Sequence, residues 1–241
     1  MPNIITKGLI PIQQKNHRVI LEYISPYSRK EKAVFNFPPL KWQKVSKFLD
    51  SDIIILNMIS GWDINKNTYL KLCERVRKKL YLDVHFLVMG VDKLGKRFPQ
   101  RPDNIRDWLR GARYIQMNHR EFEIITDKSL SEKEFFQEYF ISDQVLIITK
   151  GRNGATAVYK EHGQIKTEDV PAPQLKTLVD TTGCGDAFGS GFVYGLLKKL
   201  HLKDALKFAN CVAAANALLR GTNEMHRLKE TMKNLQCGEV D

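Results

Sequence analysis

The 241-residue sequence has no apolar run close to the roughly 18 residues that suggest a membrane span, and Met1–Ile10 contains no apolar core of a secretory signal. We therefore expect a cytoplasmic protein with no membrane-embedded part. The four cysteines are scattered and form no CxxC pair, so the sequence indicates neither a zinc site nor a disulfide framework. None of the six histidines has metal-ligand spacing such as HExxH or HxxxH.

Acidic residues are outnumbered by basic ones. Lys and Arg total 38 against 27 Asp and Glu, which gives a formal net charge of +11. This excess favours anionic partners such as nucleotides, sugar phosphates or nucleic acid. The basic residues are spread along the chain, with no basic tail and no RNA-binding aromatic motif, so nucleic acid is the least favoured of these partners.

The length fits one domain with a proper core, and the 43% apolar content is ordinary for a globular protein. From Leu40 onward, helix-like segments alternate with short apolar strands. The predicted helices cover 41–49, 64–80, 102–109, 131–140, 203–220 and 224–235, and the predicted strands cover 52–56, 80–85, 113–117 and 144–149. This alternation predicts an α/β fold with a mostly parallel sheet and helices on both faces. The continuous apolar run at 52–56 predicts a strand that is buried on both faces.

Met1–Asn36 differs from the rest of the chain and reads as β structure, which by sequence alone could be an ordinary edge hairpin. His17–Tyr23 has the pattern of a strand, Ala33–Phe37 is a shorter candidate, and Pro26 breaks the chain between them. A later hairpin is predicted over 155–170, and the basic, turn-rich segment 95–104 is expected to be a surface loop.

Polar residues follow several of the predicted strands at their carboxyl ends. Parallel α/β sheets bind ligands outside these ends, so the side chains there are candidate site residues. A polar residue at a strand end is also often only a helix cap or a turn residue. The residues concerned are Asn57, Asp83, His85, Asn118 and Thr149.

The stretch DTTGCGDAFGSGFVYGLL at 180–197 carries the strongest signal. A polar turn leads into an apolar helix, and we place Asp186 at or just before the helix start. The backbone N–H groups of Gly183, Cys184 and Gly185 are unhindered there, and helix N-termini bind anions. A carboxylate beside an anion site suits a base that accepts a hydroxyl proton while the amides stabilise a transferred phosphoryl group. The alternative is that Asp186 is only an N-cap and the glycines only a turn.

Two further motifs follow predicted strands. NHRE, at 118–121, places an amide and an acid three residues apart on one helix face, which is also the pattern of a capping box. TKGRNG, at 149–154, has two glycines that allow phosphate to approach the backbone, with Lys150 and Arg152 adding positive charge. On its own, this second motif is a weak turn signal.

Together these motifs resemble those of the ribokinase-like, or PfkB, carbohydrate kinases. The run DTTGCGDAFGSGF is similar to the family's second signature, DTxGAGD, with Cys184 in place of the usual alanine. NHRE and TKGRNG resemble its NxxE and T-x-G-x-x-G motifs, and FAN at 208–210 resembles the start of its last helix. The resemblance implies one ribokinase-like domain over 1–241, in which 1–38 is a lid-like β segment and 39–241 is the nucleotide-binding body.

The resemblance also implies a chemistry. Asp186 is then the catalytic base and the amides of Gly183, Cys184 and Gly185 form an anion hole, in an ATP-dependent transfer to a hydroxyl of a sugar or sugar-like substrate. A small sugar or nucleoside is the implied partner, and a homodimer through the lid is an arrangement that the family allows.

Residues for the cofactors follow from the same resemblance. Mg²⁺ is implied near Glu121, held indirectly through water, and Asp180 matches a position of a monovalent-cation site that would take K⁺. Asn210 matches a position near adenine, although a polar residue on a packed helix is an equal interpretation. The residues implied to bind the nucleotide are Asn118, Glu121, Thr149, Lys150, Gly151, Gly154 and Asn210.

The sequence also departs from the family pattern. A full member begins with Rossmann-type strands and carries a Gly-Gly-x-x-x-Asn motif that contacts the sugar, whereas this sequence contains no Gly-Gly pair. We therefore expect a sheet without the N-terminal Rossmann strands, which exposes an unpaired edge, and only the remnant of a lid. The alternative function is a non-catalytic, shortened relative that binds nucleotide or a protein partner.

Overall fold

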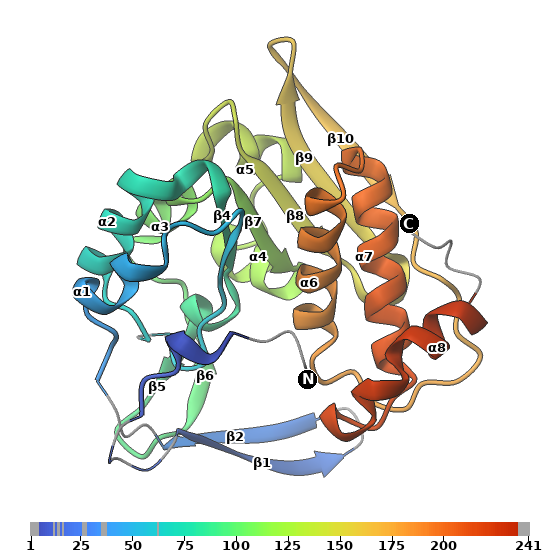
Figure 1. The fold of residues 1–241 in the computed structure, drawn as a ribbon, viewed down its shortest axis with the longest axis horizontal. Coiled ribbons are helices and arrows are strands. Elements are labelled where there is room, and N and C mark those ends of the chain that lie inside the picture. Colours follow the sequence, from blue (N-terminus) through green and yellow to red (C-terminus); the bar gives the residue numbers. More distant parts are fainter. Residues whose placement is uncertain are drawn as a thin grey trace.

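The computed structural model describes residues 5–11, 13, 15, 17–25, 28–34, 38–61 and 63–235. Figure 1 shows a central sheet between two layers of helices, with a β hairpin at one side. The α-helices are α1 (Trp42–Val45), α2 (Lys66–Val76), α3 (Ile105–Gly111), α4 (His119–Thr126), α5 (Glu132–Tyr139), α6 (Cys184–Leu197), α7 (Leu202–Ala217) and α8 (Leu228–Asn234). The strands are β1 (Arg18–Ser25), β2 (Ser28–Val34), β3 (Ile54–Leu56), β4 (Leu80–Asp83), β5 (Met89–Val91), β6 (Arg97–Pro99), β7 (Tyr114–Asn118), β8 (Val145–Thr149), β9 (Ala155–Glu161) and β10 (Gln164–Val170).

The central sheet has six strands in the order β10-β9-β8-β7-β4-β3. Strands β3, β4, β7 and β8 pair in parallel, and β9 and β10 continue the sheet as an antiparallel hairpin. The predicted α/β fold with a mostly parallel sheet is thus confirmed. The parallel strands all end at one edge of the sheet, where ligands bind in folds of this kind.

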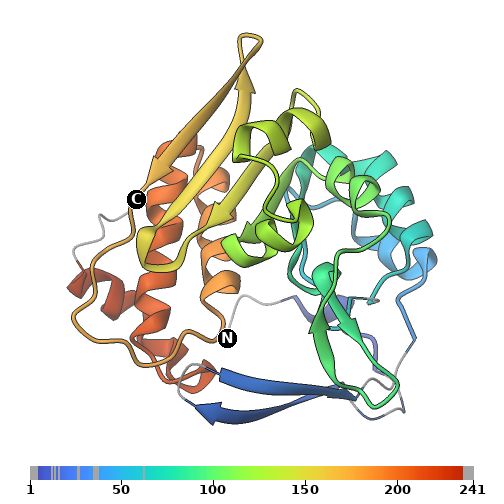
Figure 2. The ribbon, with the colours of Figure 1, turned by 180° about the vertical axis from the view of Figure 1, so that it is seen from behind.

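The sheet separates two hydrophobic cores. Leu82, Met117 and Ile148 pack with α2, α3, α4 and α5, whereas Tyr81 and Ile147 pack with α6 and α7. Figures 1 and 2 show the same division, with α6 and α7 on one face and α4 and α5 on the other. Because successive side chains of a strand point to opposite faces, neighbouring residues of one strand serve different cores.

Strand β3 differs from the prediction. The segment 52–56 reads as a strand buried on both faces, but β3 is a three-residue edge strand in which Ile55 is 45% exposed. Its apolar residues therefore have a packing partner on one side only. Within the described residues, β3 is thus the unpaired edge of the six-stranded sheet.

The N-terminal β segment forms a separate antiparallel hairpin of β1 and β2. The second strand covers 28–34 rather than the predicted 33–37, and residues 35–37 lie outside the described residues. Glu31 pairs with Arg97 at 2.9 Å, which ties the hairpin to the β5–β6 pair. The segment 95–104 was predicted to be a loop, but it contains the strand β6. Figure 2 shows the hairpin lying across the carboxyl-end side of the body; its role as a lid stays a prediction.

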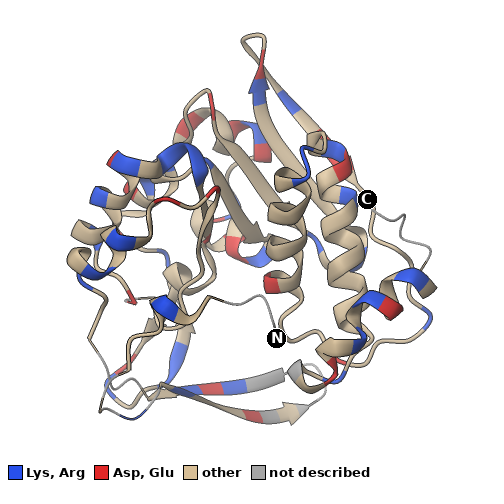
Figure 3. Cartoon of the chain, in the orientation of Figure 1, with Lys and Arg blue, Asp and Glu red and all other residues tan. Residues whose placement is uncertain are grey.

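The expectations from composition have different outcomes. No helix in the described part of the chain is long and apolar enough to cross a bilayer. Lys and Arg are spread over helices, strands and loops in Figure 3 rather than gathered on one element. Among the described cysteines, Cys73 and Cys184 are free thiols.

Candidate active site

The turn before α6 brings the helix N-terminus to the carboxyl edge of the sheet. Gly183 is the N-cap residue and has a φ of 76°, a left-handed conformation that favours glycine. The Thr182 N–H donates to Asp180 Oδ1 at 2.8 Å, and the Cys184 N–H donates to the Thr181 carbonyl at 3.2 Å. Side chain and backbone bonds of the turn therefore fix how the chain enters the helix.

Asp186 lies inside the first turn of α6 and is exposed. The helix starts at Cys184 and its N-cap residue is Gly183, which makes Asp186 the third residue of the helix. The interpretation of Asp186 as an N-cap is therefore wrong. The Asn57 amide, directly after β3, donates to Asp186 Oδ1. The carboxylate is thereby oriented by a residue 129 positions earlier in the sequence.

A buried hydrogen-bond network lies under this turn. The Gln116 side chain of β7 donates to Asp83 Oδ2 and to the Gly185 carbonyl, both at 3.1 Å, and accepts a bond from the Tyr81 hydroxyl. Asp83 Oδ1 also accepts the His85 N–H at 3.0 Å. Burial, aided by the charges of nearby carboxylates, raises the pKa of Asp83 to about 6. Sequence reasoning identified Asp83 but missed Tyr81 and Gln116, although a glutamine within a buried strand is itself a signal.

Glu121 is held by two partners beside this network. Its carboxylate accepts the Asn118 backbone N–H at 2.8 Å and the Asn118 amide at 2.5 Å, and its own N–H donates to Asn118 Oδ1, so NHRE forms a complete capping box. His85 Nδ1 lies 2.7 Å from Glu121 Oε1. Burial lowers the pKa of His85, but the hydrogen bond and charge of Glu121 outweigh burial and the net shift is upward.

The NHRE and TKGRNG motifs meet at one cavity. Lys150 projects from the loop after β8, where its Nζ lies 2.7 Å from Glu132 Oε1 and 2.6 Å from Thr156 Oγ1. This ammonium group is therefore held in place rather than free to rotate. The cavity is about 440 Å³ in volume and is lined by Asn118, His119, Arg120, Thr149, Lys150, Gly151 and Asn153. Two segments that the family resemblance implies for nucleotide binding thus line one space.

Comparison with known proteins now decides the family. The family model of the pfkB family carbohydrate kinases matches residues 32–228. The chain belongs to the PfkB family. In sequence it is 31% identical over 91 residues to a 5-dehydro-2-deoxygluconokinase of Clostridium botulinum, a match that covers 38% of this chain and 26% of the relative.

Solved PfkB-like structures share the fold. A ribokinase from Thermotoga maritima superposes with a TM-score of 0.71 at 19% identity, covering 95% of this chain and 72% of that one. A pyrophosphate-dependent kinase of the ribokinase family, complexed with a pyrophosphate analog and myo-inositol, gives 0.67 at 17% identity, covering 83% and 70%. The ribokinase-like fold expected from the motifs is confirmed. The sequence match itself spans about a quarter of the length of the curated relative.

Asn210 and Gly154 serve packing in this PfkB chain. The Asn210 side chain is buried and donates to the Val170 carbonyl at 3.0 Å and to the Pro171 carbonyl at 3.4 Å, which ties α7 to the end of β10. Gly154 packs against the backbone of the same segment, since an added Cβ would lie 2.0 Å from the Val170 oxygen. Both contacts fit structural roles, and contact of either residue with nucleotide stays a prediction.

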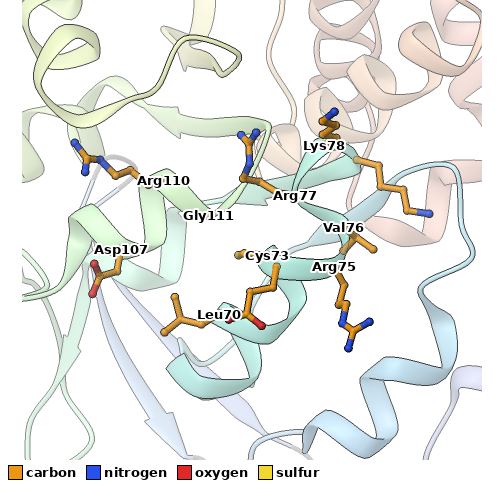
Figure 4. Close-up of a pocket in the computed structure, with 11 residues that line it drawn as sticks. Leu70, Cys73, Arg75, Val76, Arg77, Lys78, Asp107, Arg110 and Gly111 are labelled. Atoms are coloured by element: carbon orange, nitrogen blue, oxygen red, sulfur yellow. The ribbon is translucent and has the colours of Figure 1, made fainter.

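A second, larger cavity lies away from the PfkB motifs. It is about 800 Å³ in volume and lies between α2, the following Arg77–Lys79 turn and α3. The turn leads directly into β4, so this cavity is at the amino end of the strand, opposite the site of Asp186. Figure 4 shows the basic side chains of Arg75, Arg77 and Arg110 pointing away from one another. They do not converge on a shared phosphate position.

Proposed function

We propose that this chain is a phosphotransferase that moves the terminal phosphoryl group of ATP to a hydroxyl of a sugar or sugar-like substrate. The observation that supports this best is that the first turn of α6 and the cavity of the two motifs lie at the same end of β7. Gln116 of β7 contacts the first turn of α6, and β7 ends two residues later at Asn118, in the cavity of the NHRE and TKGRNG motifs. An exposed carboxylate, Asp186, and a candidate phosphate cavity therefore share one edge of the sheet.

Asp186 acts as the base in this proposal. The substrate hydroxyl proton passes to the carboxylate, the substrate oxygen attacks the terminal phosphorus, and the nucleoside diphosphate leaves. Asn57 donates to one carboxylate oxygen and leaves the other for the substrate hydroxyl. The first residues of a helix have N–H groups without intrahelical partners, so the amides of Gly183 and Gly185 are donors for the phosphoryl charge. The Cys184 amide, part of the same hole in the sequence interpretation, is already engaged by Thr181.

Lys150 and the capping-box residues serve the donor side. Lys150 lines the cavity, and its positive charge suits phosphate oxygens. Glu121 is 4% exposed and its two oxygens already accept three hydrogen bonds, which excludes an inner-shell metal bond without rearrangement. The polar groups of Glu121 and Asn118 fit a hydrated Mg²⁺ that they would hold through water, because Mg²⁺ usually keeps several waters. When bound, Mg²⁺ neutralises charge on the transferred phosphate.

Asp180 is the residue that would hold K⁺ in this chain. Asp180 accepts the Thr182 N–H within its own turn, and the Asp180 N–H donates to the Ala217 carbonyl at 3.2 Å. These bonds close the loop against the end of α7. A dependence of turnover on K⁺ over Na⁺ would support a monovalent-cation role for Asp180.

A transfer assay tests the proposal. The chain is incubated with Mg²⁺ and either ATP or pyrophosphate, together with ribose, fructose, myo-inositol, 5-dehydro-2-deoxygluconate or a nucleoside, and products are identified by ³¹P NMR. ATP binding is measured separately by calorimetry. We expect a phosphorylated product with ATP and at least one acceptor. ATP binding without any product favours the non-catalytic alternative, and product from pyrophosphate alone overturns ATP as the donor.

A further inference from the structure

Gln116 occupies the junction between the sheet and the first turn of α6. Its side chain is 3% exposed and uses its whole amide: both N–H bonds donate, to Asp83 and to the Gly185 carbonyl, and the oxygen accepts from Tyr81. Since Gly185 directly precedes Asp186, this bond reaches the backbone next to the proposed base. Two partners, Tyr81 and Asp83, lie in β4 and the third, Gly185, lies in α6. Because Gln116 itself lies in β7, one side chain joins three elements.

The helix packs directly on this network. An added Cβ at Gly189, one turn into α6, would lie 3.1 Å from the Tyr81 hydroxyl oxygen and 3.3 Å from Gln116 Oε1. Such spacing is tighter than most side-chain contacts, so the helix backbone approaches the network as closely as glycine allows. Gln116 therefore contacts α6 through its hydrogen bond to Gly185, and both Tyr81 and Gln116 pack against the helix at Gly189.

We propose that Gln116 is a positioning residue that fixes the first turn of α6, and with it the Asp186 carboxylate and the Gly183 and Gly185 amides, in the geometry for phosphoryl transfer. The catalytic part of this inference rests on the proposed function. Reacting groups must be held within a fraction of an ångström, so loosening one helical turn lowers the rate of transfer without abolishing substrate binding. None of the recognised motifs contains Gln116.

The chain provides a matched control in Gln144. This glutamine is 1% exposed and also makes three side-chain hydrogen bonds: it donates to the Leu109 and Ala112 carbonyls at 2.7 and 2.5 Å and accepts the Ile141 N–H at 2.8 Å. It precedes β8, at the amino end of the sheet. Gln116→Met and Gln144→Met therefore remove the same number of bonds from equally buried sites, and only the first touches α6.

The experiment compares these two variants with the unmodified chain by hydrogen–deuterium exchange of the peptide covering 180–190. We expect exchange in this peptide to be roughly 3-fold faster or more in Gln116→Met and unchanged in Gln144→Met. Equal exchange in the two variants overturns the proposal. This readout needs no turnover, so it remains valid if the transfer assay fails.

Kinetics separate positioning from general stability. In Gln116→Met we expect kcat to fall roughly 10-fold to 100-fold, with the KM for ATP changed by less than about 3-fold, and Gln144→Met to keep the original kcat. In an Asp186→Asn background, Gln116→Met should add little further loss, because both changes affect the same carboxylate. A fully multiplicative loss contradicts positioning through Asp186. Activity retained in Asp186→Asn contradicts the proposed function instead.

Tyr81→Phe keeps the inference testable if Gln116→Met does not fold. It removes only the hydroxyl that donates to Gln116 and retains the buried ring. We expect faster exchange of the 180–190 peptide, to a smaller extent than in Gln116→Met. Exchange in that peptide identical to that of the unmodified chain overturns the proposal.

Discussion

Replacing Gly154 with alanine tests why the segment after β8 contains its second glycine. Gly154 has φ 93° and ψ −137°, in a part of conformational space that few residues other than glycine adopt. An alanine Cβ would lie 2.0 Å from the Val170 oxygen and 2.7 Å from the Ala172 nitrogen, and both are backbone atoms that cannot rotate away. Backbone strain of about 1–3 kcal/mol and a clash of similar size predict a loss of roughly 2–6 kcal/mol in the free energy of unfolding.

Gly151 and Gly163 provide the contrast. Their φ angles are 57° and 81°, and an added Cβ at either would meet no atom within 4 Å. Alanine there should cost only the left-handed backbone penalty of about 1–2 kcal/mol. Urea unfolding of the three variants, followed by circular dichroism, measures these losses. A loss below about 1 kcal/mol in Gly154→Ala, or equal losses in all three, would refute the steric reasoning.

Three further predictions concern single side chains. The hydrogen bonds from Arg77 hold the pKa of Asp143 below its ordinary value of 3.8, so Asp143 stabilises the fold above that pH and loses this contribution as pH falls through its lower folded pKa. The stability difference between the unmodified chain and Asp143→Asn should therefore vanish in acid, and a constant difference down to about pH 2 contradicts the assignment. Cys184→Ala should change kcat by less than about 10-fold, because a backbone N–H is unaltered; a loss above roughly 100-fold would mean that the thiol participates. Asn210→Ala should lower the free energy of unfolding by about 1–3 kcal/mol, because two carbonyls lose their donor. Weaker ATP binding in calorimetry with unchanged stability would instead support a place beside adenine.

Local sequence pattern was sufficient for the centre of the sheet. The predicted strands at 80–85, 113–117 and 144–149 correspond to β4, β7 and β8 within two residues at each end. These strands are buried on both faces, so their apolar runs are nearly continuous and bounded by polar residues. The segment 52–56, which contains β3, has the same apolar character, yet β3 is short and only partly buried. Its burial depends on neighbours that the local pattern does not encode.

Short strands held by tertiary contacts were not predictable. Strand β6 has three residues, of which Pro99 is one, and its stability comes from pairing with β5 and from the ion pair of Arg97 with Glu31. No alternation of three residues can be distinguished from a loop. For this reason, the segment 95–104 was predicted to be a loop.

The motifs of the candidate site were predictable from the sequence, but the residues that hold those motifs in place were not. Asp186, Asn118 and Lys150 are recognisable because their spacing to glycines and to a strand end is local. The contact of Asn57 with Asp186 joins residues 129 positions apart, and the Gln116 contact with Gly185 joins residues 69 positions apart. Such contacts arise only after the strands have been ordered in the sheet. The residues that orient the base are therefore those that sequence reasoning left as caps or missed.

The measurement that tests the central claim most directly is the kcat of Asp186→Asn beside that of Asp204→Asn. Asp204 is the third residue of α7, as Asp186 is of α6, and it is exposed and paired only with Lys207 at 3.0 Å in the described contacts. With ATP and an accepted sugar, we expect Asp186→Asn to lose 10²–10⁴-fold, roughly the contribution of a general base, and Asp204→Asn to lose nothing. Turnover of Asp186→Asn within a few-fold of that of the unmodified chain would contradict the assignment of the base.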